Sequence, residues 1–135
     1  MNPRSYGKEH LLAIVVMVGA VALAGCGQGS RPTVGEWQPT WTSLVQAIPT
    51  QAELGDPADM DLCATTLGLL RERAPDLSPT PDMSADDAVA DWLSIAETAF
   101  FECPPSSGEI TSFAVAYEEL RRLESEVNAG LGLGQ

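Results

Sequence analysis

Apolar residues recur at helical spacing in four segments between residues 40 and 129. The first segment lies between Pro39 and Pro49. Its apolar residues occupy positions i, i+3, i+4 and i+7: Trp41, Leu44, Val45 and Ile48. This spacing places the side chains on one face of a helix, and the flanking prolines limit its length. We therefore expect a short first helix.

A second segment begins at Asp56-Pro57, where the aspartate can cap a helix and the proline suits its first turn. Its apolar residues follow at alternating spacings of three and four: Met60, Cys63, Leu67, Leu70 and Ala74. Pro75 ends the pattern because proline cannot continue a helix. The sequence predicts a second helix over residues 57–74.

Two more segments each open with a serine that an acidic residue follows three positions later, the pattern of a capping box. Ser84 and Asp87 precede the third, which Pro104 and Pro105 end. Its apolar face contains Ala88, Val89, Trp92, Ala96, Ala99, Phe100 and Cys103. Ser106 and Glu109 precede the fourth, whose apolar face contains Phe113, Ala116, Leu120, Leu123 and Val127.

These segments indicate an all-α fold, because no window alternates with the period of two that strands show. Short connections between helices favour antiparallel neighbours. We expect a small antiparallel helical bundle over residues 40–129, made of three long helices and a shorter first one. Residues 130–135 are predicted to form a disordered tail.

The first 25 residues have the organisation of a secretory signal. Arg4 and Lys8 supply positive charge before an uncharged apolar run over residues 11–25. A helix that crosses a bilayer needs roughly 20 apolar residues. The shorter run therefore favours a cleaved signal peptide, residues 1–25, over a permanent membrane span.

The end of this segment, Leu23-Ala24-Gly25-Cys26, resembles the lipobox of bacterial lipoproteins. The resemblance covers the first 26 residues and implies that Cys26 carries a lipid and becomes the first residue of the mature chain. It also implies a location on the extracytoplasmic face of a membrane, since a diacylglyceryl group anchors a protein stably. An ordinary cleaved signal followed by a chance cysteine is the alternative.

Residues 26–39 are rich in Gly, Pro and polar residues and show no helical spacing. This composition predicts a flexible tether between the lipid and the bundle. Trp41 is expected in the core of the bundle. For Trp37 the sequence leaves two places open, the membrane interface and the end of the bundle.

The other two cysteines, Cys63 and Cys103, are expected to form a disulfide, because an extracytoplasmic compartment is oxidising. Antiparallel packing would bring the start of the second helix to the end of the third, where these cysteines lie. Neither belongs to a CxxC motif. A structural bridge is therefore favoured over a redox-active pair.

Charge narrows the range of partners. The chain has 19 acidic and 7 basic residues, of which one acidic and two basic residues lie in residues 1–25. The remaining 18 acidic and 5 basic residues give the mature chain a formal charge of -13. Such a field repels nucleic acids and anionic lipids. It favours basic proteins or cations, although charge that merely keeps the domain soluble is the simpler explanation.

Candidate chemistry is sparse. The only histidine, His10, lies in the signal segment, so a histidine-dependent triad or zinc site is not expected. The cluster of Asp56, Asp59 and Asp61 lacks the spacing of a calcium loop and is better explained by helix capping. The Glu118, Arg122 and Glu126 series fits an exposed helix face. We expect no cofactor and no metal.

The leading hypothesis is a membrane-anchored, non-enzymatic interaction or accessory module that binds an envelope protein. The alternative is a small binding protein for a lipid, a cation or a basic peptide. A hydrolase that uses two carboxylates is a third possibility, and it would need a carboxyl group with a raised pKa.

Overall fold

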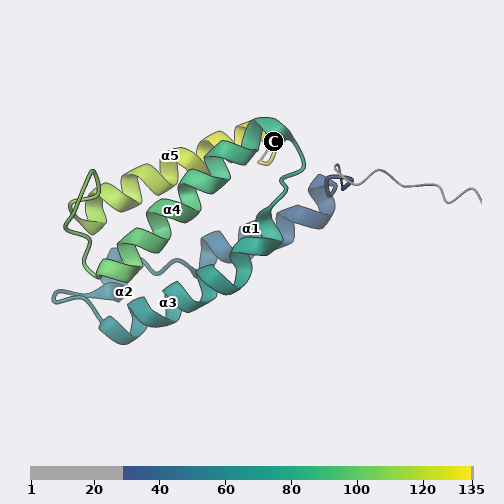
Figure 1. Cartoon of the computed structure of the whole chain (residues 1–135). Helices are drawn as coiled ribbons and strands as arrows, with labels where there is room; N and C mark the ends of the chain where they lie inside the picture. Colours follow the sequence, from purple (N-terminus) through teal and green to yellow (C-terminus); the bar gives the residue numbers. More distant parts are fainter. Residues whose placement is uncertain (1–28, 135) are drawn as a thin grey trace, which may run out of the picture.

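The computed structural model describes residues 29–134, and these residues form five α-helices (Figure 1). The α-helices are α1 (Val34–Ala47), α2 (Gln51–Leu54), α3 (Met60–Arg73), α4 (Asp86–Glu102) and α5 (Phe113–Leu131). Two 3₁₀ turns, η1 (Ala74–Leu77) and η2 (Met83–Ala85), lie between α3 and α4. No strand occurs among the described residues, which confirms the all-α prediction for them. The predicted signal peptide and Cys26 lie outside this range.

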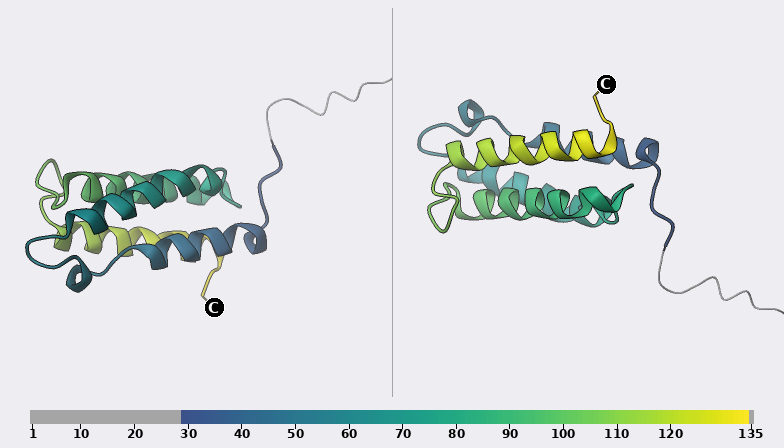
Figure 2. Two further views of the ribbon diagram at one scale, coloured as in Figure 1. Left: turned by 90° about the horizontal axis from the view of Figure 1, so that it is seen from below. Right: turned by 90° about the horizontal axis from the view of Figure 1, so that it is seen from above.

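The long helices run in alternating directions, so the bundle has two distinct ends (Figures 1 and 2). The entry end contains the segment that leads into α1, the connection from α3 to α4, and the end of α5. The far end contains α2, the start of α3, and the connection from α4 to α5. Both termini of the described chain therefore lie at the entry end.

The first helix begins earlier than the sequence pattern predicts. The hydroxyl of Thr33 accepts a hydrogen bond from the backbone N–H of Glu36, and the Glu36 carboxylate accepts one from the Thr33 N–H. This capping box starts α1 at Val34, seven residues before Trp41. The helix then continues through Pro39 and has 14 residues, as many as α3. The predicted short first helix and the tether boundary at residue 39 are both wrong.

Helices α3, α4 and α5 begin later than predicted. The residues expected to cap them do not do so: Asp56, Ser84 and Ser106. Instead, Asp59 accepts hydrogen bonds from two backbone N–H groups in the first turn of α3, at 2.9 and 3.0 Å. Ser112 caps α5, and α4 continues directly from η2 at Asp86. Ser, Thr and Asp residues stand at several positions near each start, and only the tertiary structure selects the one that caps.

The chain also stays ordered further than predicted at its carboxyl end. Helix α5 continues to Leu131, and Gly132 adopts a left-handed conformation with φ of 66°. The backbone N–H of Leu133 then donates to the carbonyl of Asn128 at 2.8 Å. Leu131 and Leu133 pack against the core. A disordered tail from residue 130 is therefore wrong for residues 130–134.

The centre of the core is a cluster of three tryptophans, which we call the tryptophan cluster: Trp37, Trp41 and Trp92. The rings of Trp37 and Trp41 stack with centroids 5.5 Å apart. Trp92 from α4 meets Trp41 edge-on at 5.0 Å. Trp41 is thus in the core as predicted, and Trp37, whose place was open, is only 2% exposed.

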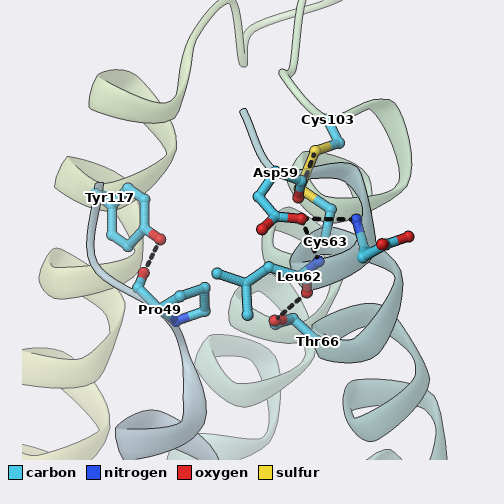
Figure 3. The surroundings of a disulfide bond; sticks show 8 residues. Pro49, Asp59, Leu62, Cys63, Thr66, Cys103 and Tyr117 are labelled. Carbon is cyan, nitrogen blue, oxygen red and sulfur yellow. Dashed lines mark hydrogen bonds between the residues drawn. A yellow bond between two sulfur atoms is a disulfide. The ribbon is translucent and has the colours of Figure 1, made fainter. Parts of the chain in front are cut away.

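The predicted disulfide between Cys63 and Cys103 is confirmed, and it joins the start of α3 to the end of α4 at the far end (Figure 3). Their Cα atoms are 6.2 Å apart. Both cysteines are buried. The bridge closes a loop that contains most of α3 and the whole of α4.

Replacing both cysteines by alanine should lower the free energy of unfolding. The bridge joins residues 40 positions apart, and closing such a loop contributes about 4 kcal/mol in the chain-entropy treatment. Thermal unfolding followed by circular dichroism measures the effect. Reductant should lower the Tm of the unsubstituted protein and leave that of the double alanine variant unchanged. An equal effect on both proteins would contradict the assignment.

Candidate functional site

Two grooves run along the sides of α5, and together they are the candidate functional surface. The α4–α5 groove has a volume of about 510 Å³. Its walls are Ile95, Glu109, Ile110, Val115, Glu118, Glu119 and Arg122. The α1–α5 groove has a volume of about 410 Å³. Its walls are Val45, Ile48, Pro49, Thr50, Gln51, Tyr117, Arg121 and Glu124.

The α4–α5 groove combines apolar side chains with carboxylates. Ile95, Ile110 and Val115 supply its apolar part, and Val115 is 38% exposed, one of the few large apolar side chains at the surface. Glu109 and Glu118 form no ion pair within residues 29–134. The groove therefore presents two uncompensated carboxylates beside an apolar surface.

Arg122 is the single basic residue of this groove, and its charge is already compensated. Its guanidinium contacts the Glu119 carboxylate at 2.5 Å and the Glu126 carboxylate at 3.0 Å. These contacts raise the pKa of Arg122, chiefly through the hydrogen bond to Glu119. The predicted partner Glu126 is thus present, whereas Glu119 takes the place expected for Glu118.

In the α1–α5 groove, two polar side chains of α5 bind backbone carbonyls. The Tyr117 hydroxyl donates to the carbonyl of Pro49 (Figure 3). Burial, with a smaller effect of the Glu53 charge, raises the pKa of Tyr117 to about 12. Arg121 donates through Nε to the backbone carbonyl of Tyr117 at 3.2 Å, and it forms no ion pair in the described part of the chain.

Glu124 closes this groove on the core side. Its Oε1 accepts a hydrogen bond from the indole N–H of Trp92 at 3.1 Å. Burial raises the pKa of the Glu124 carboxyl, although the Trp92 hydrogen bond and the charge of Arg121 act in the opposite direction. Desolvation thus outweighs both partners, and this carboxyl binds a proton more readily than an exposed glutamate.

At the entry end of the bundle, a set of hydrogen-bonded polar side chains fixes the segment that leads into α1. Arg31 binds the Asp86 carboxylate through both terminal nitrogens, at 2.9 and 2.8 Å. It also donates to the carbonyl of Thr80 at 2.9 Å. The hydrogen bonds from Arg31 and Thr80 hold the pKa of Asp86 well below its usual range. We call this group the Arg31 clamp.

The acidic cluster predicted near the start of α3 acts as a helix cap. Asp59 accepts the two backbone hydrogen bonds described above, and Asp56 lies in the loop before the helix. No group of three or more His, Cys, Asp or Glu side chains in residues 29–134 is arranged to hold a metal ion.

Neither groove was foreseen from the sequence. The α1–α5 groove joins the first and last helices of the bundle, and the α4–α5 groove depends on how the side chains of two consecutive helices and their connection pack. The Arg31 clamp was also missed, although one signal for it exists. Arg31 is the only basic residue between Cys26 and Arg71. An isolated cation in so acidic a chain is well placed to bind a carboxylate of the folded domain.

No protein-family model matches this chain, and no curated protein or solved structure matches it. Over residues 29–134, no helix has the length and apolar character that crossing a bilayer requires.

Glu124→Gln should make the protein more stable relative to the unsubstituted chain as the pH rises above about 4.5. Glutamine keeps an acceptor for Trp92 but never ionises. Because the folded-state pKa of Glu124 is raised, ionisation at higher pH costs stability that is fully present at low pH. The Tm values of the variant and the unsubstituted protein should therefore match at low pH, and the variant should have the higher Tm toward neutral pH. A constant difference at every pH would contradict the raised pKa.

Proposed function

We propose that this protein is a lipid-anchored, extracytoplasmic interaction module without enzymatic activity, and that its α4–α5 groove binds a basic segment of a partner envelope protein. The observation behind the docking part is the pairing of an apolar surface with the uncompensated carboxylates of Glu109 and Glu118. The anchoring part depends on the lipobox-like sequence that ends at Cys26.

Lipid anchoring fits the charge of the domain. A mature chain with a formal charge of -13, derived above from the sequence, is repelled by anionic headgroups. Attachment through its own surface charge is therefore disfavoured, whereas acyl chains on Cys26 would hold it regardless of charge. Once tethered, the domain would meet its partner at the membrane, where even a weak interaction is favoured by the high local concentration.

The chemistry of the α4–α5 groove favours a particular kind of partner segment. Apolar side chains would contact Ile95, Ile110 and Val115, while a lysine or arginine beside them would meet Glu109 or Glu118. A volume of about 510 Å³ accommodates a few side chains rather than a large interface. This size supports a reversible contact, as in accessory or assembly factors.

The absence of enzymatic activity is part of the proposal. A two-carboxylate hydrolase needs an acid with a raised pKa and a second carboxylate nearby. Glu124 meets the first requirement, but it is the single carboxylate in the wall of its groove. The chain from residue 26 onward also lacks histidine, the commonest general base.

The α1–α5 groove supports a second candidate, a small binding protein for a lipid. Val45, Ile48 and the ring of Tyr117 offer an apolar surface, and Arg121 can bind an anionic headgroup. Native mass spectrometry of gently purified protein would then show a retained ligand that Arg121→Gln removes. A mass equal to the oxidised polypeptide with its lipid anchor would argue against this candidate.

Cys26→Ser should release the protein from the membrane, because serine cannot form the thioether that holds the lipid. The measurement is fractionation of bacterial cells that make the protein, with mass spectrometry of the mature amino-terminal peptide. Ser30→Ala, in the same segment, is the matched control and should stay with the membrane. Equal membrane retention of the Cys26→Ser variant would overturn the anchor.

A photo-crosslinking amino acid in place of Val115 should capture a partner in intact membranes, whereas one in place of the exposed Thr42 on α1 should not. Glu118→Lys should reduce the capture several-fold, because it reverses the charge that a basic segment meets, and added salt should weaken it. Glu72→Lys on α3 makes the same charge change away from the groove and should have no effect. Identical products from positions 115 and 42 would contradict docking at this groove.

A further inference from the structure

The Arg31 clamp limits how far the bundle can lie from a lipid on Cys26. Only residues 27–30 separate Cys26 from Arg31. A fully extended chain spans at most about 3.6 Å per residue, so these two residues lie within about 18 Å of each other. Helix α4 alone has 17 residues and is about 25 Å long. With the clamp closed, the entry end is therefore the end nearest to the lipid.

The surface at the entry end is suited to contact with headgroups. Met83, in η2, is 72% exposed and is the most exposed large apolar side chain of the described residues. Two of the carboxylates near it are already bound, whereas Asp87, four residues along the chain, is exposed and forms no ion pair within residues 29–134. Asp82 accepts from the N–H and hydroxyl of Ser84 at 2.8 and 2.7 Å, and Asp86 is held by Arg31.

Bound carboxylates cost less to bring toward a lipid surface than free ones, because their hydrogen bonds and ion pairs persist when water is displaced. The α4–α5 groove instead places the uncompensated carboxylates of Glu118, on the side of the bundle, and Glu109, at its far end, beside one another. The electrostatic cost therefore disfavours a bundle that lies flat on the membrane and favours one that stands on its entry end.

We propose that the entry end of the bundle rests on the bilayer, with Met83 inserted among the lipid headgroups, and that the Arg31 clamp fixes this orientation. The inference depends on the lipid anchor of the proposed function. The partner here is the lipid surface itself. In this orientation α4 and α5 stand away from the membrane, and the disulfide end points outward.

The chain offers a matched pair of positions for the test. Met60, at the start of α3 on the far end, is 61% exposed. Lipidated full-length protein is reconstituted into phosphatidylcholine vesicles with brominated acyl chains, which quench tryptophan emission at close range. The three native tryptophans are at most 2% exposed and give a constant background.

The Met83→Trp variant should lose several times more emission than the Met60→Trp variant. Equal quenching of both would indicate a bundle that lies flat, and quenching of neither would indicate a bundle held off the surface. Either result overturns the proposed orientation. Flotation with the vesicles separates this failure from failure of the anchor, because protein that does not float disproves the lipid anchor itself.

The clamp is tested by adding Arg31→Met to both tryptophan variants. Opening the clamp lengthens the connection to Cys26, so quenching of the Met83→Trp variant should fall toward that of the Met60→Trp variant while flotation is unchanged. Far-UV circular dichroism checks that the helices persist. If the bundle stays folded and quenching does not change, Arg31 does not set the orientation.

Discussion

Packing of the tryptophan cluster is the interaction on which the other features of this bundle depend. Each indole ring is large, buried and polar at one edge, so it needs both apolar neighbours and a hydrogen-bond acceptor. Trp37 donates to the carbonyl of Leu77, Trp41 to the side-chain oxygen of Asn128 and Trp92 to Glu124, each at 3.1 Å. The three bonds join α1 to η1, α1 to α5, and α4 to α5. The tryptophan cluster thereby sets the positions of four segments relative to one another.

The acceptors for two of these indoles explain why α5 is the wall shared by both grooves. Glu124 and Asn128 lie on one side of α5, with Arg121 about one turn and Tyr117 about two turns before Glu124. Glu124 and Asn128 bind core tryptophans, and Tyr117 binds the chain just after α1. That side therefore cannot pack as a simple apolar face and leaves a partly polar groove. The other side of α5 lines the α4–α5 groove and presents Val115 and Glu118. One helix thus offers two surfaces of different chemistry.

The sequence predicts those features that depend on one helix or on residue counting. Trp41 follows from its place in an apolar stripe, and the bridge from Cys63 to Cys103 follows from antiparallel neighbours and an even number of remaining cysteines. Trp37 could not be placed, because Pro39 suggests a helix boundary and the capping box that overrides it begins at Thr33. The grooves and the Arg31 clamp could not be predicted either. The clamp and the α1–α5 groove require side chains far apart in sequence. The α4–α5 groove depends on how the side chains of two consecutive helices and their connection pack, which only the tertiary structure determines.

Helix α4 is fastened at both ends, and the two fastenings respond to different conditions. At its start, Asp86 binds Arg31, and because the folded-state pKa of Asp86 is lowered, this stabilisation is present above about pH 3.8 and is lost as the pH falls further. At its end, Cys103 is bonded covalently to α3, and acid or salt does not break this bond. Salt also weakens an exposed ion pair. The entry end is consequently the part of the bundle that solution conditions can loosen first, while the far end stays closed as long as the disulfide is oxidised.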